Sequence, residues 1–284
     1  MAARNHVLTR AVVALVAAST LTLSACSGDD SSGEPEATAT GESSPSASAT
    51  PTVAPEPALG ACYRLTVAQL TEAHPEAAPV PCTQPHTTQT YLMTTLSGIA
   101  EPIDATAVAA TAQRQCRGAL RAYLRATPAR LALSRATSAW FVPTDDDLEA
   151  GARWLRCDVA VSRTDTTLMN LPENAAGLLR RDAALDRYGR CASTDQAGIA
   201  AGRGGRVCAL PHTWRAVSAR RLGAAGDPYP GASVRGAVLD RCEDAARAYT
   251  DNSTGDIDVG WLPPSRAEWA AGDRFGLCWT RTRE

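Results

Sequence analysis

The cysteines of this chain constrain its fold more than any other feature, because eight of the nine fall into two sets of four with repeating surroundings. The segment Cys82-Thr-Gln-Pro-His86 returns as Cys208-Ala-Leu-Pro-His212 in the second set. Spacing changes slightly between motifs but not within them, as loops between fixed elements allow. The pattern predicts a tandem duplication of one domain of about a hundred residues. Other positions match in the same order: Cys62 with Cys191, Cys116 with Cys242, Tyr123 with Tyr249, Trp140 with Trp261, and Cys157 with Cys278.

Hydrophobic periodicity predicts the elements of each repeat. Cys116, Leu120 and Tyr123 recur at helical spacing, so they define one apolar face. The segment that follows the proline–histidine motif is rich in threonine, and the segment around Cys157 alternates apolar and polar residues, as strands do. We therefore expect an α+β fold, in which each domain packs a helix on a small antiparallel sheet. The predicted helices are residues 114–126 and 234–250, and the clearest predicted strands are residues 87–96 and 153–161.

The cysteines are expected to form disulfides, because four cysteines in a small domain outside the cytosol are typical of two bridges. In each repeat the third cysteine lies on the buried helix face, and the fourth lies in the last strand. We therefore favour the pairs Cys62–Cys82, Cys116–Cys157, Cys191–Cys208 and Cys242–Cys278. A nested arrangement, with Cys62–Cys157 and Cys82–Cys116, remains the alternative because sequence alone does not fix connectivity.

A short capped helix is predicted between the helix and the last strand of each repeat. Thr144 precedes Asp147, and Ser265 precedes Glu268, at the spacing of a capping box. A glycine ends each segment, as left-handed helix termini require. The acids after Thr144 resemble a calcium loop, but the second repeat retains a single acid there, and calcium needs six or more oxygen ligands. We expect no metal at this segment.

The N-terminal region is typical of a lipoprotein. Residues 1–25 combine two arginines with a short apolar run, and the run ends at Leu23-Ser-Ala-Cys26. We expect Cys26 to become the acylated N-terminus, which would hold the protein on the outer leaflet of the plasma membrane. An ordinary signal peptide with a chance cysteine is the alternative. Residues 26–58 are rich in Ser, Thr and Pro with few apolar side chains, so they are expected to form a disordered tether.

His86 and His212 are the only residues whose placement suggests chemistry. One histidine per repeat supplies too few ligands for a metal unless both meet at one ion, and disulfide cysteines are lost as thiolate ligands. We favour a structural role, in which each imidazole bonds the backbone at the start of a strand. We interpret Trp140 and Trp261 as residues that anchor the core rather than as aromatic platforms for a ligand. We find no hydrolase elbow, phosphate loop or metalloprotease motif, and we expect no cofactor and no enzymatic activity.

The charge pattern does not favour a nucleic-acid partner. The formal net charge is −2, and the basic residues form no polybasic run. All 28 basic residues are arginine, which together with the high alanine content indicates the codon usage of a GC-rich genome.

The ordered motifs resemble the actinobacterial septum-formation domain family: Gly-x-Cys, Cys-x-x-Pro-His, a helix with Cys and Tyr, then Trp and Gly-x-Arg-x-x-x-Cys. The resemblance covers residues 59–161 and 188–284, which a connection of residues 162–187 joins. It implies an envelope protein with a link to cell division, and it brings no established catalytic residue. The chain departs from the pattern at Gln89 and Arg215, where an acid commonly follows the histidine by three positions.

The expected function is that of a non-enzymatic envelope lipoprotein, a binding or scaffold module linked to septum formation. Its expected partners are the plasma membrane, reached through the lipid anchor, and an unidentified envelope protein or cell-wall polymer. The alternative is an extracytoplasmic enzyme or metal sensor that uses His86 and His212.

Overall fold

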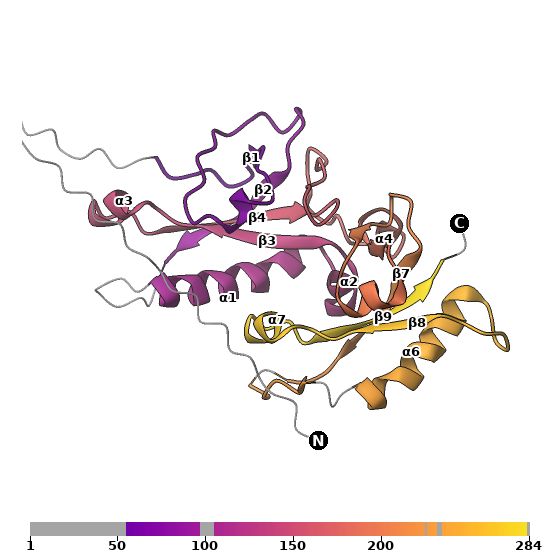
Figure 1. Cartoon of the computed structure of the whole chain (residues 1–284). Coiled ribbons are helices and arrows are strands. Elements are labelled where there is room, and N and C mark those ends of the chain that lie inside the picture. The colour runs from indigo at the N-terminus through magenta and orange to yellow at the C-terminus, as the bar shows by residue number, and fades with distance from the viewer. Residues whose placement is uncertain (1–54, 97–104, 225, 232–234, 283–284) are drawn as a thin grey trace, which may run out of the picture. The chain divides into compact units, whose positions relative to one another are not determined.

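Two antiparallel β-sheets carry the fold of the computed structural model, which describes residues 55–96, 105–224, 226–231 and 235–282 (Figure 1). The first sheet has the order β1-β2-β4-β3, and the second has the order β6-β5-β7-β9-β8. Apart from the added strand β6, the two orders are the same, and the expected α+β class is confirmed. The strands are β1 (Cys62–Tyr63), β2 (Thr88–Thr95), β3 (Ala136–Phe141), β4 (Trp154–Val161), β5 (Arg190–Ala192), β6 (Gly205–Val207), β7 (Trp214–Arg221), β8 (Val259–Leu262) and β9 (Phe275–Arg281).

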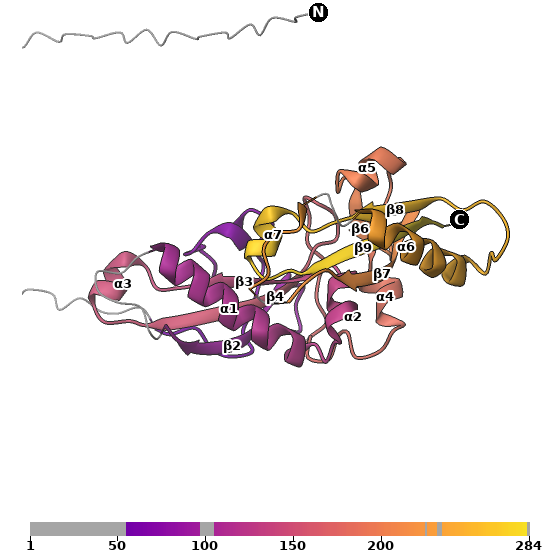
Figure 2. The same ribbon diagram turned by 90° about the horizontal axis from the view of Figure 1, so that it is seen from below.

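One long helix lies along each sheet, α1 (Ala105–Tyr123) on the first and α6 (Arg235–Thr250) on the second (Figure 2). Helix α1 begins earlier than residue 114, because the preceding residues are mostly alanine, the best helix former. In the part of the chain that the structure describes, no helix is both long enough and apolar enough to cross a membrane. The short helices are η1 (Gln69–Thr71), α2 (Pro128–Leu133), α3 (Asp145–Glu149), α4 (Ala184–Tyr188), α5 (Gln196–Ala200) and α7 (Arg266–Ala270).

Both long helices end in the same way. Arg125 (φ 51°) and Asp251 (φ 52°) are the two non-glycine residues with positive φ among the described residues, and each lies just past its helix. The backbone N–H of the next residue then bonds back into the last turn, from Ala126 to Arg121 and from Asn252 to Arg247. These bonds satisfy carbonyls that the helix end would leave open. Arg125 and Asp251 have different side chains but the same left-handed backbone conformation. The chain reversal after each helix, rather than the side chain, therefore fixes this conformation.

The short capped helices form as their spacing predicts. The Thr144 side chain accepts from the backbone N–H of Asp147, and Ser265 with Glu268 forms a complete capping box. Gly151 (φ 98°) and Gly272 (φ 89°) follow α3 and α7 in conformations that an L side chain would strain.

Four disulfides connect these elements, and they are the four pairs that the sequence favours. Cys116–Cys157 and Cys242–Cys278 tie each long helix to the last strand of its sheet, with Cα–Cα distances of 5.5 and 5.1 Å. Cys62–Cys82 and Cys191–Cys208 tie the first strand of each half to the loop before the proline–histidine motif. Each bridge stays within its own half of the chain.

The cores of the two halves share side chains. Leu171, Ala175 and Leu179, from the predicted connection, are buried in the core under α1, together with Val207 from the second half. In return, Ala132 and Leu133 of α2 pack on the core of the second sheet. The described residues therefore belong to one compact unit. Residues 1–54, which include the predicted signal peptide, Cys26 and most of the tether, lie outside the described residues.

Candidate functional site

The duplicated histidines occupy the same position, directly before β2 and β7. Nδ1 of His86 lies 2.8 Å from the backbone oxygen of Gln84, and Nδ1 of His212 lies 2.8 Å from that of Leu210. Because a carbonyl oxygen only accepts, each Nδ1 carries the proton and donates it two residues back. His86 is 1% exposed, and its Nε2 is buried without a hydrogen-bond partner among the described residues. This geometry agrees with a structural role, in which the imidazole holds the turn that leads into the strand.

One group of three potential metal ligands comes together among the described residues: Cys191, Cys208 and His212. Two of its members are the sulfurs of a single disulfide, and a disulfide sulfur does not act as a thiolate ligand. His86 is not part of this group. The described residues thus do not unite the two histidines in a site of three or more ligands.

The matched tryptophans differ in their surroundings. Trp261 is buried in the second half, where its ring covers Gly276, so that a Cβ atom there would lie 2.0 Å from the ring. Trp140 is only partly buried, because the residue that matches Gly276 is Leu155, which fills the core beneath it. Trp140 therefore reaches the surface of a groove, whereas Trp261 does not. The anchor role expected for both fits Trp261 better.

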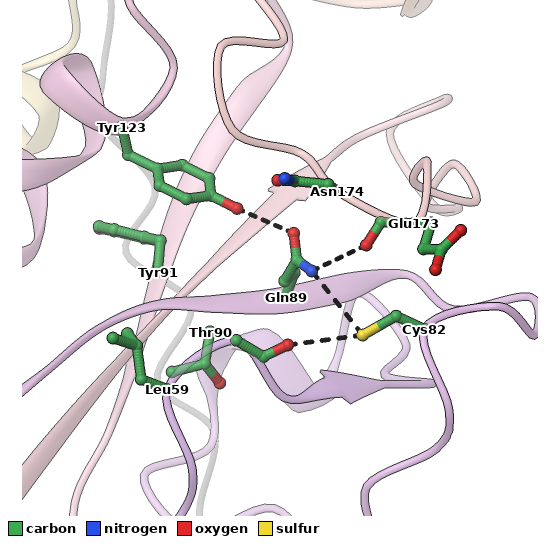
Figure 3. A pocket seen from close by; sticks show the side chains of 9 residues that line it. Leu59, Cys82, Gln89, Thr90, Tyr91, Tyr123, Glu173 and Asn174 are labelled. Carbon is green, nitrogen blue, oxygen red and sulfur yellow. Dashed lines mark hydrogen bonds between the residues drawn. The ribbon is translucent and has the colours of Figure 1, made fainter.

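A shallow pocket of about 620 Å³ lies beside the first disulfide, and Gln89 forms its floor (Figure 3). The side-chain oxygen of Gln89 accepts from the hydroxyl of Tyr123 at 2.8 Å and from the backbone N–H of Ala175 at 2.9 Å. Its amide nitrogen donates to the backbone oxygen of Glu173 at 3.0 Å and lies 3.7 Å from the sulfur of Cys82. A carboxylate could not supply this donor, so the departure at Gln89 has a structural reason.

The residue three positions after the histidine contacts the helix tyrosine in both halves. Gln89 bonds Tyr123, whereas the guanidinium of Arg215 lies 5.4 Å from the ring of Tyr249 and bonds Asp186 at 2.7 Å. Because the polar groups of Gln89 are already paired within the chain, its pocket offers few free partners to a ligand. We therefore regard Gln89 as a structural link between Tyr123 of α1 and the segment around Ala175.

A second cavity, of about 700 Å³, is an open groove between the halves, and its lining is polar and charged. We call it the arginine groove. One wall is α1, which contributes Arg114, Arg117 and Arg121, and the opposite wall includes Glu268 and Asp273 at α7. Figures 1 and 2 both show α7 beside α1. The edge strand β3, with Trp140, Thr137 and Ser138, and the partly buried Arg190 complete the lining.

The charges of the groove are unequal. Asp273 pairs with Arg117 at 3.6 Å, and Glu268 is engaged in its capping box. Arg114 and Arg121 are exposed, and neither forms an ion pair with a described residue. A concave surface with an excess of one sign focuses its field and attracts the opposite charge. The groove is thus chemically suited to hold an anion.

Sequence reasoning did not predict this groove. It did not treat the arginines of the predicted helix at residues 114–126 as a site. A signal was nevertheless present: Arg114, Arg117 and Arg121 follow helical spacing on a helix without a single acid. Of the four candidate site residues His86, His212, Trp140 and Trp261, the groove lining includes Trp140.

Comparison with curated proteins and with solved structures finds no match. The family model described as septum formation matches residues 60–278, which include the whole first sheet and most of the second. This stretch contains the cysteine and proline–histidine motifs that resemble the family, and it is more than half of the chain. The chain belongs to the septum-formation family.

Proposed function

We propose that this chain is a non-enzymatic lipoprotein on the outer face of the plasma membrane of an actinobacterium, where it serves as a binding or scaffold module linked to septum formation. Family membership supports the link to septum formation. The lipoprotein signal at Cys26 supports the location. Four disulfides suit an oxidising compartment outside the cytosol.

The proposal includes an origin by tandem duplication. The strand orders β1-β2-β4-β3 and β5-β7-β9-β8 support it, as do the equivalent disulfides and the left-handed residues after α1 and α6. The shared cores add that the two copies have become dependent on each other. The binding surface therefore belongs to the pair of copies.

The arginine groove carries the proposal of a binding role. The described residues that line it include cationic and aromatic side chains, whereas histidine and cysteine are not among them. Such a lining can hold a ligand by charge and contact. Its two carboxylates already have partners, because Asp273 pairs with Arg117 and Glu268 accepts from the backbone in its capping box.

An extracytoplasmic enzyme or metal sensor built on His86 and His212 remains the alternative. It has less support, because each imidazole donates to a nearby backbone oxygen and thereby has a structural task. Metal analysis of the purified protein tests it. A stoichiometric metal that disappears in both His86→Ala and His212→Ala would favour the alternative.

Anchoring is tested with the full chain in its host. Wild-type protein should partition into the detergent phase, because two or more acyl chains bind a membrane far better than one. The variant Cys26→Ala should remain in the aqueous phase. Equal partitioning of the two proteins would refute the lipoprotein assignment.

Binding is tested by crosslinking in intact cells. A photoreactive residue in place of Thr137, which is exposed on β3 in the groove, should capture an envelope component. The same residue in place of Arg181, which is exposed and not part of the groove lining, is the control. No product at position 137, or equal products at both positions, would contradict a binding role for the groove.

A further inference from the structure

The placement of arginines on α1 points to a ligand with repeated negative groups. Every Lys or Arg position of the chain is arginine, so the choice of arginine over lysine does not indicate a function. The positions of these arginines are informative. Arg114, Arg117 and Arg121 lie on one side of the helix and extend along it for roughly 10 Å. At the first two matching positions, α6 has Asp240 and Glu243 instead. The cationic row is therefore a property of the groove and not of the repeated scaffold.

The groove retains positive charge after its internal ion pairs are counted. Asp273 lies near Arg117, at the long distance of 3.6 Å. Arg114 donates to the hydroxyl of Thr111, which is neutral, and Arg121 forms no ion pair with a described residue. Two exposed guanidinium groups thus face solvent at one wall. Their planar forks can each bind a phosphate or carboxylate through two hydrogen bonds.

Arg190 adds a cation to the lining of the groove. Its Nε donates to the backbone oxygen of Ala132 at 2.9 Å, and it forms no ion pair in the described part of the chain. Burial lowers the pKa of the Arg190 guanidinium, and the charge of Arg135 lowers it further, whereas the nearby charges of Asp273, Glu268 and Asp165 raise it. A partly buried cation without a directly bonded counter-ion carries a desolvation cost. An anion that entered the groove would reduce this cost.

The remaining lining is suited to a sugar. The partly exposed Trp140 presents an aromatic ring, and its indole N–H forms no hydrogen bond with a described residue. Gln113, Thr137 and Ser138 add amide and hydroxyl groups around it. Ligand sites commonly combine an aromatic surface with a few placed polar groups. A purely acidic peptide would use the arginines but would leave this polar and aromatic wall without a specific partner.

From this combination we propose that the arginine groove binds an anionic cell-wall glycopolymer, a sugar polymer that carries phosphate or carboxylate groups. The cationic row on α1 contacts successive anionic groups, Arg190 holds one of them, and Trp140 packs on a sugar ring. This proposal rests on the proposed function, because it names the ligand class of the same groove.

The test uses full-length protein, solubilised in detergent and mixed with insoluble cell walls purified from the host and treated with protease. The variant Arg114→Gln/Arg121→Gln removes two exposed charges, and the control Arg181→Gln/Arg241→Gln removes two exposed charges that are not in the groove lining. The groove variant should sediment with an apparent Kd raised about tenfold or more, and the control should stay within about twofold. Melting temperatures of both variants should match wild type, since neither changes a buried side chain.

Further arms identify the source of the anion. Raising salt from about 0.05 to 0.5 M should weaken wild-type binding severalfold, because exposed charges are screened. Walls stripped of phosphate polymers by acid should lose binding if phosphate is the ligand, and should retain it if the ligand is the carboxylate of the wall itself. Either result supports the proposal. A groove variant that binds like wild type, or binding that does not depend on salt, would overturn it.

The outcome is separable from the proposed function. Binding to untreated walls that disappears after protease treatment would identify an acidic protein as the partner, which overturns the glycopolymer but preserves a binding module. If the full chain is neither retained by any wall preparation nor crosslinked through position 137, both proposals fail together.

Discussion

The first half of the molecule, residues 59–161, and the second half, residues 188–284, share a scaffold but differ in what they bury on the sheet face away from the long helix. In the first half β4 places Arg156 and Asp158 there, which are 5% and 0% exposed and pair at 2.8 Å. At the matching positions of β9 stand Leu277 and Trp279, both buried in an apolar cluster. A sheet of one topology thus holds an ion pair in one half and tryptophan in the other.

The surroundings of this face have changed together. Thr88 and Thr90 donate to the two carboxylate oxygens of Asp158, at 3.0 and 2.8 Å. The residues that match them are Trp214 and Ala216, which join the apolar cluster of the second sheet. Every polar group of the first network has a partner, as a buried network requires. The comparison shows that helix, strands and bridges fix the fold, while the contents of the face can be exchanged as a set.

The helix side of the sheets shows a second exchange. Gly276 leaves room for the ring of Trp261, whereas Leu155 at the matching position excludes Trp140 from the core. One substitution in a neighbouring strand therefore explains why one tryptophan is an anchor and the other lines the groove. In the first half the partly exposed Trp140 lines the arginine groove, and the second half supplies the opposite wall through α7.

The largest effect is expected from breaking the buried ion pair. Arg156→Leu introduces the residue type of the second half but leaves Asp158 buried without its counter-ion. Removing one member of such a pair costs about 3 to 5 kcal/mol of unfolding free energy. Arg156→Leu/Asp158→Leu should be less destabilised than the single variant, because no charge is then left alone. Urea unfolding measures both, and a single variant that loses less than about 1 kcal/mol would show that the pair is not a structural unit.

The same measurement tests the independence of the halves. Since Val207 packs in the first core and Leu133 packs in the second, we expect one cooperative transition that shifts as a whole. Two transitions, of which only the first moves in Arg156→Leu, would indicate separately folding domains.

Local signals explain what could be predicted from the sequence. The cap at Ser265, the glycine at Gly272 and the cysteine on the buried face of α1 each depend on near neighbours, so their roles are visible in the linear chain. Strand β3 was not predicted, because two of its inward positions are Ala136 and Ala139, and alanine is a weak strand former. The sequence thus predicts the repeated scaffold better than its variations.

The groove could not be predicted for a different reason. It requires Arg117 of α1 to lie near Asp273 at the end of α7, and that contact depends on how the halves pack. Helix α2, which was not among the predicted helices, contributes to this packing through Ala132 and Leu133. Pro128 stands at the first turn of α2, where its missing N–H costs nothing, and Thr127 caps that turn.

An intermediate effect is expected where the two tryptophan environments differ. Gly276→Ala places a Cβ atom 2.0 Å from the ring of Trp261, so the ring must shift, at a cost of about 1 to 3 kcal/mol in unfolding free energy. Combination with Trp261→Leu should relieve most of this cost, and a double-mutant cycle would then show strong coupling. Gly118→Ala on α1 is the control, because nothing lies within 4 Å of its added Cβ. It should raise stability by about 0.5 to 1 kcal/mol. Additive losses at positions 261 and 276 would contradict the packing argument.

The smallest effect concerns the matched tyrosines of the long helices. Tyr123→Phe removes the hydroxyl that donates to Gln89, and should cost about 0.5 to 1.5 kcal/mol, because the amide oxygen keeps its bond from Ala175. Tyr249→Phe is the matched control. Tyr249 is 44% exposed, and its hydroxyl forms no hydrogen bond with a described residue, so the change should be close to neutral. Equal losses in the two variants would mean that the pocket around Gln89 is not a structural link.

The pH dependence of Tyr123→Phe tests the burial of this tyrosine in a second way. Burial raises the pKa of Tyr123 to about 12, whereas a tyrosine in the unfolded chain ionises near 10. Because the folded-state pKa is the higher one, the stability that the neutral phenol contributes is complete below about pH 10 and is lost as the pH rises towards 12. Urea unfolding of Tyr123→Phe should therefore show a smaller fall in stability between pH 9 and 11 than wild type. Burial also raises the pKa of Tyr91, so part of the fall should remain in the variant. If Tyr123→Phe retains the full wild-type slope, the buried tyrosine of the first half does not contribute to the alkaline loss of stability.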